Sequence, residues 1–97
     1  MLPSDAVPYA RTADFTESTV PPALLRAHTT KAGAWGLIRV LEGRLAYRIT
    51  DPRRPPKEMV LSPGGEPGVV EPTILHEVEP LGKVRFYVEF LRLGAGD

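Results

Sequence analysis

The chain has 97 residues, which is enough for one domain with a modest hydrophobic core. Its 12 basic and 12 acidic residues cancel, and this balance argues against a nucleic-acid-binding protein, which would carry a basic excess. There is no cysteine, so disulfides and thiolate metal sites are excluded. No stretch resembles a signal peptide or approaches the roughly 20 apolar residues of a membrane span. We therefore expect a cytoplasmic protein with neither a nucleic-acid nor a membrane partner.

Residues 1–22 are predicted to form an N-terminal arm that packs on a sheet. The segment contains four prolines, and proline fixes φ and removes a backbone donor, which excludes a long helix. Within the arm, residues 9–12 are predicted as a short edge strand and residues 14–17 as one turn or a short 3₁₀ piece.

Residues 23–28 are predicted as the first substantial strand. A strand places Leu24, Arg26 and His28 on one face. A helix is the alternative, because Ala and Leu favour helices. The strand is preferred because the segment is short and two β-branched threonines follow it.

A hairpin is predicted at residues 35–50. Apolar side chains alternate with others in the strand 45–50, and Gly43 lies in the turn that joins it to the strand 35–41. Glycine can adopt the positive φ that a tight hairpin needs.

Four further strands are predicted, at 58–61, 69–71, 75–79 and 84–93, with a turn at 80–83 between the last two. In the last strand Val84, Phe86, Val88 and Phe90 share one apolar face. Seven or eight short strands without a convincing long helix indicate a small all-β sandwich or barrel.

The assembled pattern resembles that of the cupins, which are small jelly-roll β-barrels with two sequence motifs. The end of the first motif resembles residues 40–43, and the glycine and histidine of the second resemble Gly65 and His76. More specifically, the chain resembles the tellurite-resistance-associated, YeaR-like branch of small cupins, a family of uncharacterised function. That resemblance lies in LLRAHTTKAGAWG (24–36), VLEGRLAY (40–47), EPTILHEVEP (71–80) and VRFYVEF (84–90). It implies a single-domain cupin-type jelly-roll barrel over residues 1–97, and a homodimer, since cupins commonly dimerise.

Two histidines are the candidate metal ligands, and we expect the β-framework to bring them close to one another. His28 and His76 are the only imidazoles of the chain, and Glu89 is the predicted third ligand. Two histidines and a carboxylate form a recognised open metal site, so a divalent transition metal (Zn, Ni, Fe or Mn) is expected. The usual cupin set of three histidines and a glutamate is missing, since Gly36 stands at the glutamate position. The alternative is that both histidines are hydrogen-bonded structural residues and that Glu89 pairs with Lys31 or with one of three arginines, Arg26, Arg39 or Arg85.

Three further residues are predicted to line a ligand pocket. Lys31 would attract an anionic ligand, and Trp35 and Tyr87 would supply apolar walls. The alternatives are a solvated charge for Lys31 and a place in the core or in a dimer contact for Trp35.

These residues lead to three functional hypotheses. The first is a small cupin-like protein that binds a divalent metal, a small anionic ligand such as an oxyanion, or both, in a stress or tellurite response. The second is a metal-free module that binds a small molecule. The third is a structural, dimeric β-barrel without catalytic activity. The sequence assigns no reaction and no catalytic residue.

Overall fold

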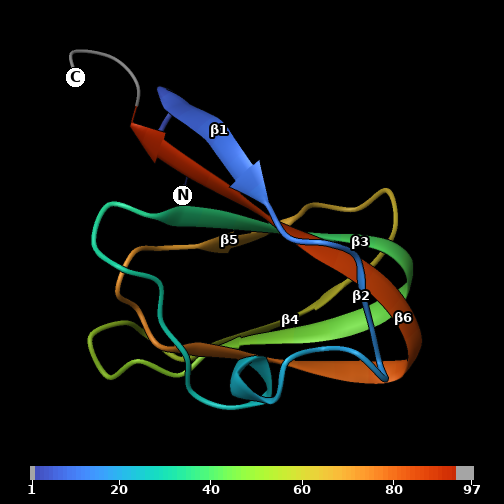
Figure 1. Ribbon diagram of the computed structural model, residues 1–97. Coiled ribbons are helices and arrows are strands. Elements are labelled where there is room, and N and C mark those ends of the chain that lie inside the picture. Colours follow the sequence, from blue (N-terminus) through green and yellow to red (C-terminus); the bar gives the residue numbers. More distant parts are fainter. Residues whose placement is uncertain (1, 94–97) are drawn as a thin grey trace.

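The computed structural model describes residues 2–93, and these residues form an antiparallel sheet that folds over on itself (Figure 1). Its main strand order is β1-β6-β3-β4, while β2 pairs with β6 and β5 pairs with β3. The elements are β1 (Ala6–Arg11), β2 (Phe15–Thr16), the 3₁₀-helix η1 (Pro22–Leu25), β3 (Trp35–Ile49), β4 (Lys57–Leu61), β5 (Gly68–Val70) and β6 (His76–Leu93).

Two long strands, β3 and β6, carry the architecture. They pair from Trp35↔Leu91 at one end to Ile49↔His76 at the other, and both curve sharply about half-way (Figure 1). The first half of β3 pairs with β5, whereas its second half pairs with β4. The curvature therefore brings the two halves of one sheet face to face, and the core lies between them.

The curvature replaces the two turns that the sequence predicts between strands. Gly43 and Gly82 do have positive φ, at 76° and 97°, but each lies inside a continuous strand. Register shifts flank Gly43, as in a β-bulge that bends a strand. A Cβ at Gly43 would lie 1.9 Å from the carbonyl oxygen of Lys83, so only glycine permits this close approach of the two bends. The predicted hairpin at 35–50 and the predicted turn at 80–83 were therefore wrong.

Two predictions in the N-terminal third were also wrong. Residues 23–28 do not form a strand, because η1 begins at Pro22, the second of two consecutive prolines, and only His28 reaches the sheet, through a single bridge. Residues 14–17 contain the short strand β2, which pairs with β6, rather than a turn. The edge strand expected at 9–12 is confirmed as β1 with earlier bounds, and the strands expected at 58–61 and 69–71 are confirmed as β4 and β5.

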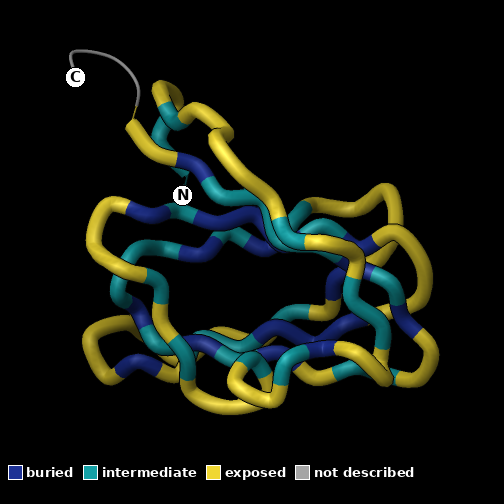
Figure 2. Tube along the Cα trace, viewed as in Figure 1, coloured by how far each residue is buried: buried dark blue, intermediate teal, exposed yellow. Residues whose placement is uncertain are grey.

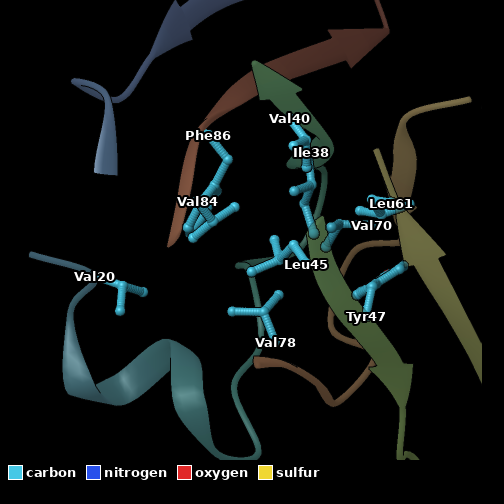
Figure 3. Packing of buried hydrophobic residues seen from close by; sticks show 10 residues of the cluster. All are labelled: Val20, Ile38, Val40, Leu45, Tyr47, Leu61, Val70, Val78, Val84 and Phe86. Carbon is cyan, nitrogen blue, oxygen red and sulfur yellow. The ribbon is translucent and has the colours of Figure 1, made fainter. Parts of the chain in front are cut away.

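The core lies between the two halves of the sheet (Figure 3). Leu45 and Phe86 are completely buried, and the Phe86 ring meets the edge of Phe15 with centroids 5.7 Å apart. Buried residues are concentrated in the long strands, while most loop residues and most of the projecting β1 are exposed (Figure 2). The cluster consists of Val20, Ile38, Val40, Leu45, Tyr47, Leu61, Val70, Val78, Val84 and Phe86.

The all-β prediction is confirmed, but the closed barrel is not. Between residues 2 and 93 no ladder joins β1 to β4, so the sheet remains open. In the same range, no helix is long and apolar enough to cross a membrane.

Candidate functional site

The two histidines lie side by side where the loop before β3 meets the start of β6. His28 and His76 exchange both backbone hydrogen bonds, each 2.9 Å long, in an isolated antiparallel bridge. Residues directly opposite in such a pair direct their side chains to the same face. The two imidazole rings accordingly meet edge to face, with centroids 5.5 Å apart. The sequence prediction that the fold brings these histidines together is confirmed.

Both rings line a cavity of about 240 Å³ between the two halves of the sheet. A cavity of about 150 Å³ can hold benzene, so this one has room for a single ring with a small substituent. Apart from the imidazoles and two threonine hydroxyls, its wall is apolar, and no aspartate or glutamate among residues 2–93 contributes to it. The remaining lining residues are Thr12, Phe15, Pro21, Ala23, Leu24, Thr30, Ile38, Val70, Val78, Phe86, Val88 and Phe90.

The His76 ring is held in one orientation. Its Nδ1 lies 3.0 Å from the carbonyl oxygen of Ile74, and the Tyr47 ring packs against it in a T-shaped arrangement with centroids 5.9 Å apart. Burial lowers the pKa of His76 below its ordinary value of 6.5, so the ring is neutral at pH 7. Tyr47 donates its hydroxyl to the Val69 carbonyl at 2.7 Å, and burial raises its pKa to about 12.

A buried carboxylate, which the sequence interpretation missed, fixes the chain next to His76. Asp51 is only 3 % exposed and accepts hydrogen bonds from the backbone N–H groups of Arg53 and Leu75 and from the Arg53 guanidinium. The guanidinium and these N–H groups hold the pKa of Asp51 well below its usual range. The sequence carried a signal for the turn but none for the burial, because an aspartate directly after a predicted strand commonly forms an Asx-turn with the N–H two residues on.

The turn before His76 is strained and held from both sides. Thr73 has a φ of 66°, which is uncommon for a β-branched residue. Its N–H donates to Thr30 at 3.1 Å, and its carbonyl accepts from Arg53 at 2.6 Å. These contacts fix the neighbouring Ile74 carbonyl, which in turn orients the His76 ring.

Glu89 and Tyr87 lie on the opposite face of β6 from the cavity-lining Phe86 and Val88. Glu89 accepts from Arg39 at 3.2 Å, and the guanidinium of Arg11 stacks 3.7 Å from the centre of the Tyr87 ring. The predicted role of Tyr87 as a pocket wall finds no support in this placement.

Lys31 and Trp35 occupy different surroundings. Lys31 lines a second, more open cavity of about 300 Å³ together with His28 and Tyr9, and no carboxylate from the described part of the chain contributes to its wall. Trp35 is partly buried at the start of β3, opposite Leu91, and lines neither of these two cavities. Of the predicted pocket residues, only Lys31 lies near the histidines.

The sequence matches a known protein family over most of its length. The model of the TehB-like domain matches residues 10–88. The chain belongs to the TehB-like family. The tellurite-resistance association expected from the sequence is thereby supported, whereas the narrower YeaR-like cupin assignment is not confirmed.

The relatives of this TehB-like chain are longer proteins. It is 30% identical over 81 residues to the probable S-adenosyl-L-methionine-dependent methyltransferase TehB of Haemophilus influenzae strain KW20 / Rd, and 28% identical to that of strain 10810. The matched region is 82% of this chain but only 28% of each relative, so the chain spans less than a third of their length.

Solved structures show the same fold. The crystal structure of TehB from Haemophilus influenzae superposes with a TM-score of 0.82 at 25% identity, over 93% of this chain and 32% of that one. A protein from Escherichia coli strain K12 superposes with a TM-score of 0.83 at 18% identity, over 97% of both chains. The TehB-like fold therefore occurs both as part of a larger chain and as nearly all of a short one.

The prediction of a divalent-metal site at His28, His76 and Glu89 was wrong. Within residues 2–93, no three His, Cys, Asp or Glu side chains come together as metal ligands, because Glu89 projects from the other face of β6. The relatives bear the name of a methyltransferase that uses S-adenosyl-L-methionine (SAM), which also contradicts the predicted cupin-like metal-binding function and its Zn, Ni, Fe or Mn cofactor.

Proposed function

We propose that this TehB-like domain is an accessory part of a SAM-dependent methylation system and that it binds the methyl acceptor in its apolar cavity. The observation that carries the proposal is the pairing of a TehB-like family match with a ring-sized cavity that no carboxylate lines. In this division of labour another domain or chain supplies SAM.

The residues of the cavity do not fit SAM itself. SAM carries a bicyclic base, a ribose and an amino acid, and these exceed a cavity of about 240 Å³. Its ribose hydroxyls and sulfonium are matched by acidic groups, and none lies on the wall. The sequence also lacks the Gly-x-Gly-x-x-Gly fingerprint with which doubly wound sheets hold nucleotides.

Toluene and S-adenosylhomocysteine are the probes for this proposal. Titrated into the ¹³C-methyl-labelled protein, toluene is expected to shift the Val78 and Val88 resonances, whereas S-adenosylhomocysteine is expected to leave them unchanged. Replacing Val88→Phe fills the cavity and should abolish the toluene response. The matched control is Val60→Phe on the surface, where the native side chain is 53% exposed. Lack of toluene binding, or shifts of these methyl groups by S-adenosylhomocysteine, would contradict the proposal.

A turnover assay tests the division of labour. Incubated with SAM and thiophenol as a model acceptor, the chain alone should form no S-adenosylhomocysteine above a buffer control. Formation of that product by the chain would show that it carries the transferase activity itself.

Several expectations from the sequence stay proposals. Bends of β3 and β6 and a core enclosed by one folded sheet support a cupin-type jelly roll. The YeaR-like branch is a proposal that is supported by the sequence resemblance alone. The exposed strand edges and apolar side chains support a homodimer, which a light-scattering mass would test. A single domain over residues 1–97 and a cytoplasmic location complete this proposal, and the balanced charge supports the absence of a nucleic-acid partner.

A further inference from the structure

The two ring nitrogens of His76 have different partners. Nδ1 lies 3.0 Å from the Ile74 carbonyl oxygen, and a carbonyl can only accept a hydrogen bond. Nδ1 must therefore carry the proton in the neutral ring, which leaves Nε2 with a free lone pair. His76 is buried and its pKa is lowered, so this neutral tautomer is the form present at pH 7.

The Nε2 atom faces the cavity. Within residues 2–93, Nε2 makes no hydrogen bond, yet no fully buried side-chain nitrogen or oxygen there lacks a partner. Nε2 must then reach accessible space, and His76 forms part of the cavity wall. An acceptor without a donor is a costly arrangement in an apolar cavity and is relieved when a ligand supplies the donor.

The neighbouring hydroxyl groups cannot supply that donor, because each already donates to a backbone carbonyl. Thr12 donates to Ala13 at 2.8 Å, and Thr30 donates to Ala34 at 2.7 Å. Tyr47, which packs against the His76 ring, donates to Val69. Around His76 the cavity therefore presents acceptors, and the His28 ring, which can act as donor or acceptor, is the one flexible polar group beside it.

We infer that the cavity selects a ring-sized apolar molecule bearing one hydroxyl or thiol group, and that His76 Nε2 accepts the hydrogen bond from it. This inference rests on the proposed function. It narrows the class of methyl acceptor to small arenols and thiols. It also gives the cavity a means of discrimination, since a methyl ether or thioether of the same molecule lacks the donor and leaves Nε2 unpaired.

Phenol and toluene are a matched pair of probes, because they have the same size and shape and differ only in the donor. In long-range ¹H–¹⁵N spectra of the whole chain, phenol is expected to shift the His76 Nε2 resonance, while toluene binds without shifting it. In His76→Leu, the ratio of the toluene to the phenol dissociation constant should fall about 2- to 10-fold, which corresponds to the usual net worth of one hydrogen bond. His28→Leu is measured in parallel, because the His28 ring also lines the cavity. The surface variant Val60→Phe is the control and should leave that ratio unchanged.

The outcomes separate this inference from the proposed function. Toluene binding combined with an unmoved Nε2 resonance on addition of phenol overturns the inference and leaves the proposed function standing. A fall of the ratio in His28→Leu and not in His76→Leu overturns the assignment of His76. If neither probe binds, the proposed function fails together with the inference. The Nε2 measurement uses the native chain, so it decides the matter even where the His76 variant does not fold.

Discussion

Two buried polar side chains lie close together, Asp51 just after the end of β3 and His76 at the start of β6. Their hydrogen-bonding groups are satisfied to different extents. Asp51 has every oxygen engaged, by two backbone N–H groups and the Arg53 guanidinium. His76 has one nitrogen engaged and the other turned to a cavity. A buried polar group with all its partners holds structure, whereas one with a partner missing is available to a ligand. The comparison separates the framework of the site from the group that does its chemistry.

The largest effect on stability is expected from Asp51→Ala. The substitution leaves the Leu75 N–H without its acceptor and releases the turn at Thr73 that Arg53 holds. The urea midpoint should fall severalfold more than in the control Asp14→Ala, whose exposed ion pairs are worth about 0–1 kcal/mol. Equal losses in the two variants would remove the structural half of the comparison.

The pH dependence of unfolding should show both groups as separate steps. The folded-state pKa of His76 is lowered. The contribution of His76 to the free energy of unfolding is therefore fully present above about pH 6.5 and is lost as the pH falls through its folded-state pKa. The pKa of Asp51 is also lowered, so its contribution is present above about pH 4 and is lost only in stronger acid.

Urea titrations from pH 8 to pH 2 measure these steps. His76→Leu should weaken the step near neutrality, and Asp51→Asn should weaken the acid step. The groups that face His76 are the His28 imidazole and the Tyr47 hydroxyl-bearing ring. His28→Leu must therefore be titrated in parallel. If the loss of stability near neutral pH vanishes in this variant and persists in His76→Leu, that step belongs to His28.

The smallest effect is expected from His28→Ala. Its side chain is only partly buried, and its two hydrogen bonds to His76 come from the backbone and survive the change. We expect a loss of about 1 kcal/mol or less in the free energy of unfolding. A loss as large as that of Asp51→Ala would show that the His28 ring belongs to the framework.

The local sequence pattern predicted most of the strands. It did not predict that β3 and β6 each run on without a turn through Gly43 and Gly82. Alternation marked the inner face of residues 84–90 correctly, and Gly43 was recognised as a residue with positive φ. Positive φ is equally compatible with a hairpin and with a bend, and the choice depended on Lys83, which lies forty residues away in sequence and against Gly43 in space. No local signal contains that contact.

The histidine pair was predictable, and its chemistry was not. The expectation that His28 and His76 meet followed from their places in the β-framework and was correct. The third ligand failed because Glu89 is one residue out of phase with the cavity-lining Val88 and Phe90, so it points to the other face and pairs with Arg39. Neither the cavity nor the burial of Asp51 could be predicted, since both depend on the packing of segments distant in sequence.

The long ladder between β3 and β6 also has a consequence for how the chain folds. The two ends of the ladder close chain loops of very different length. At the histidine end, the hydrogen bond from Leu75 to Asp51 joins residues 24 apart in sequence. At the other end, the paired Trp35 and Leu91 are more than twice as far apart along the chain. Closing a shorter loop costs less entropy, so pairing of β3 with β6 is expected to begin beside the histidines. It should then extend along the two strands towards the end where β1 pairs with β6. The binding region would then be the first part of the molecule to acquire its native shape and the last to lose it.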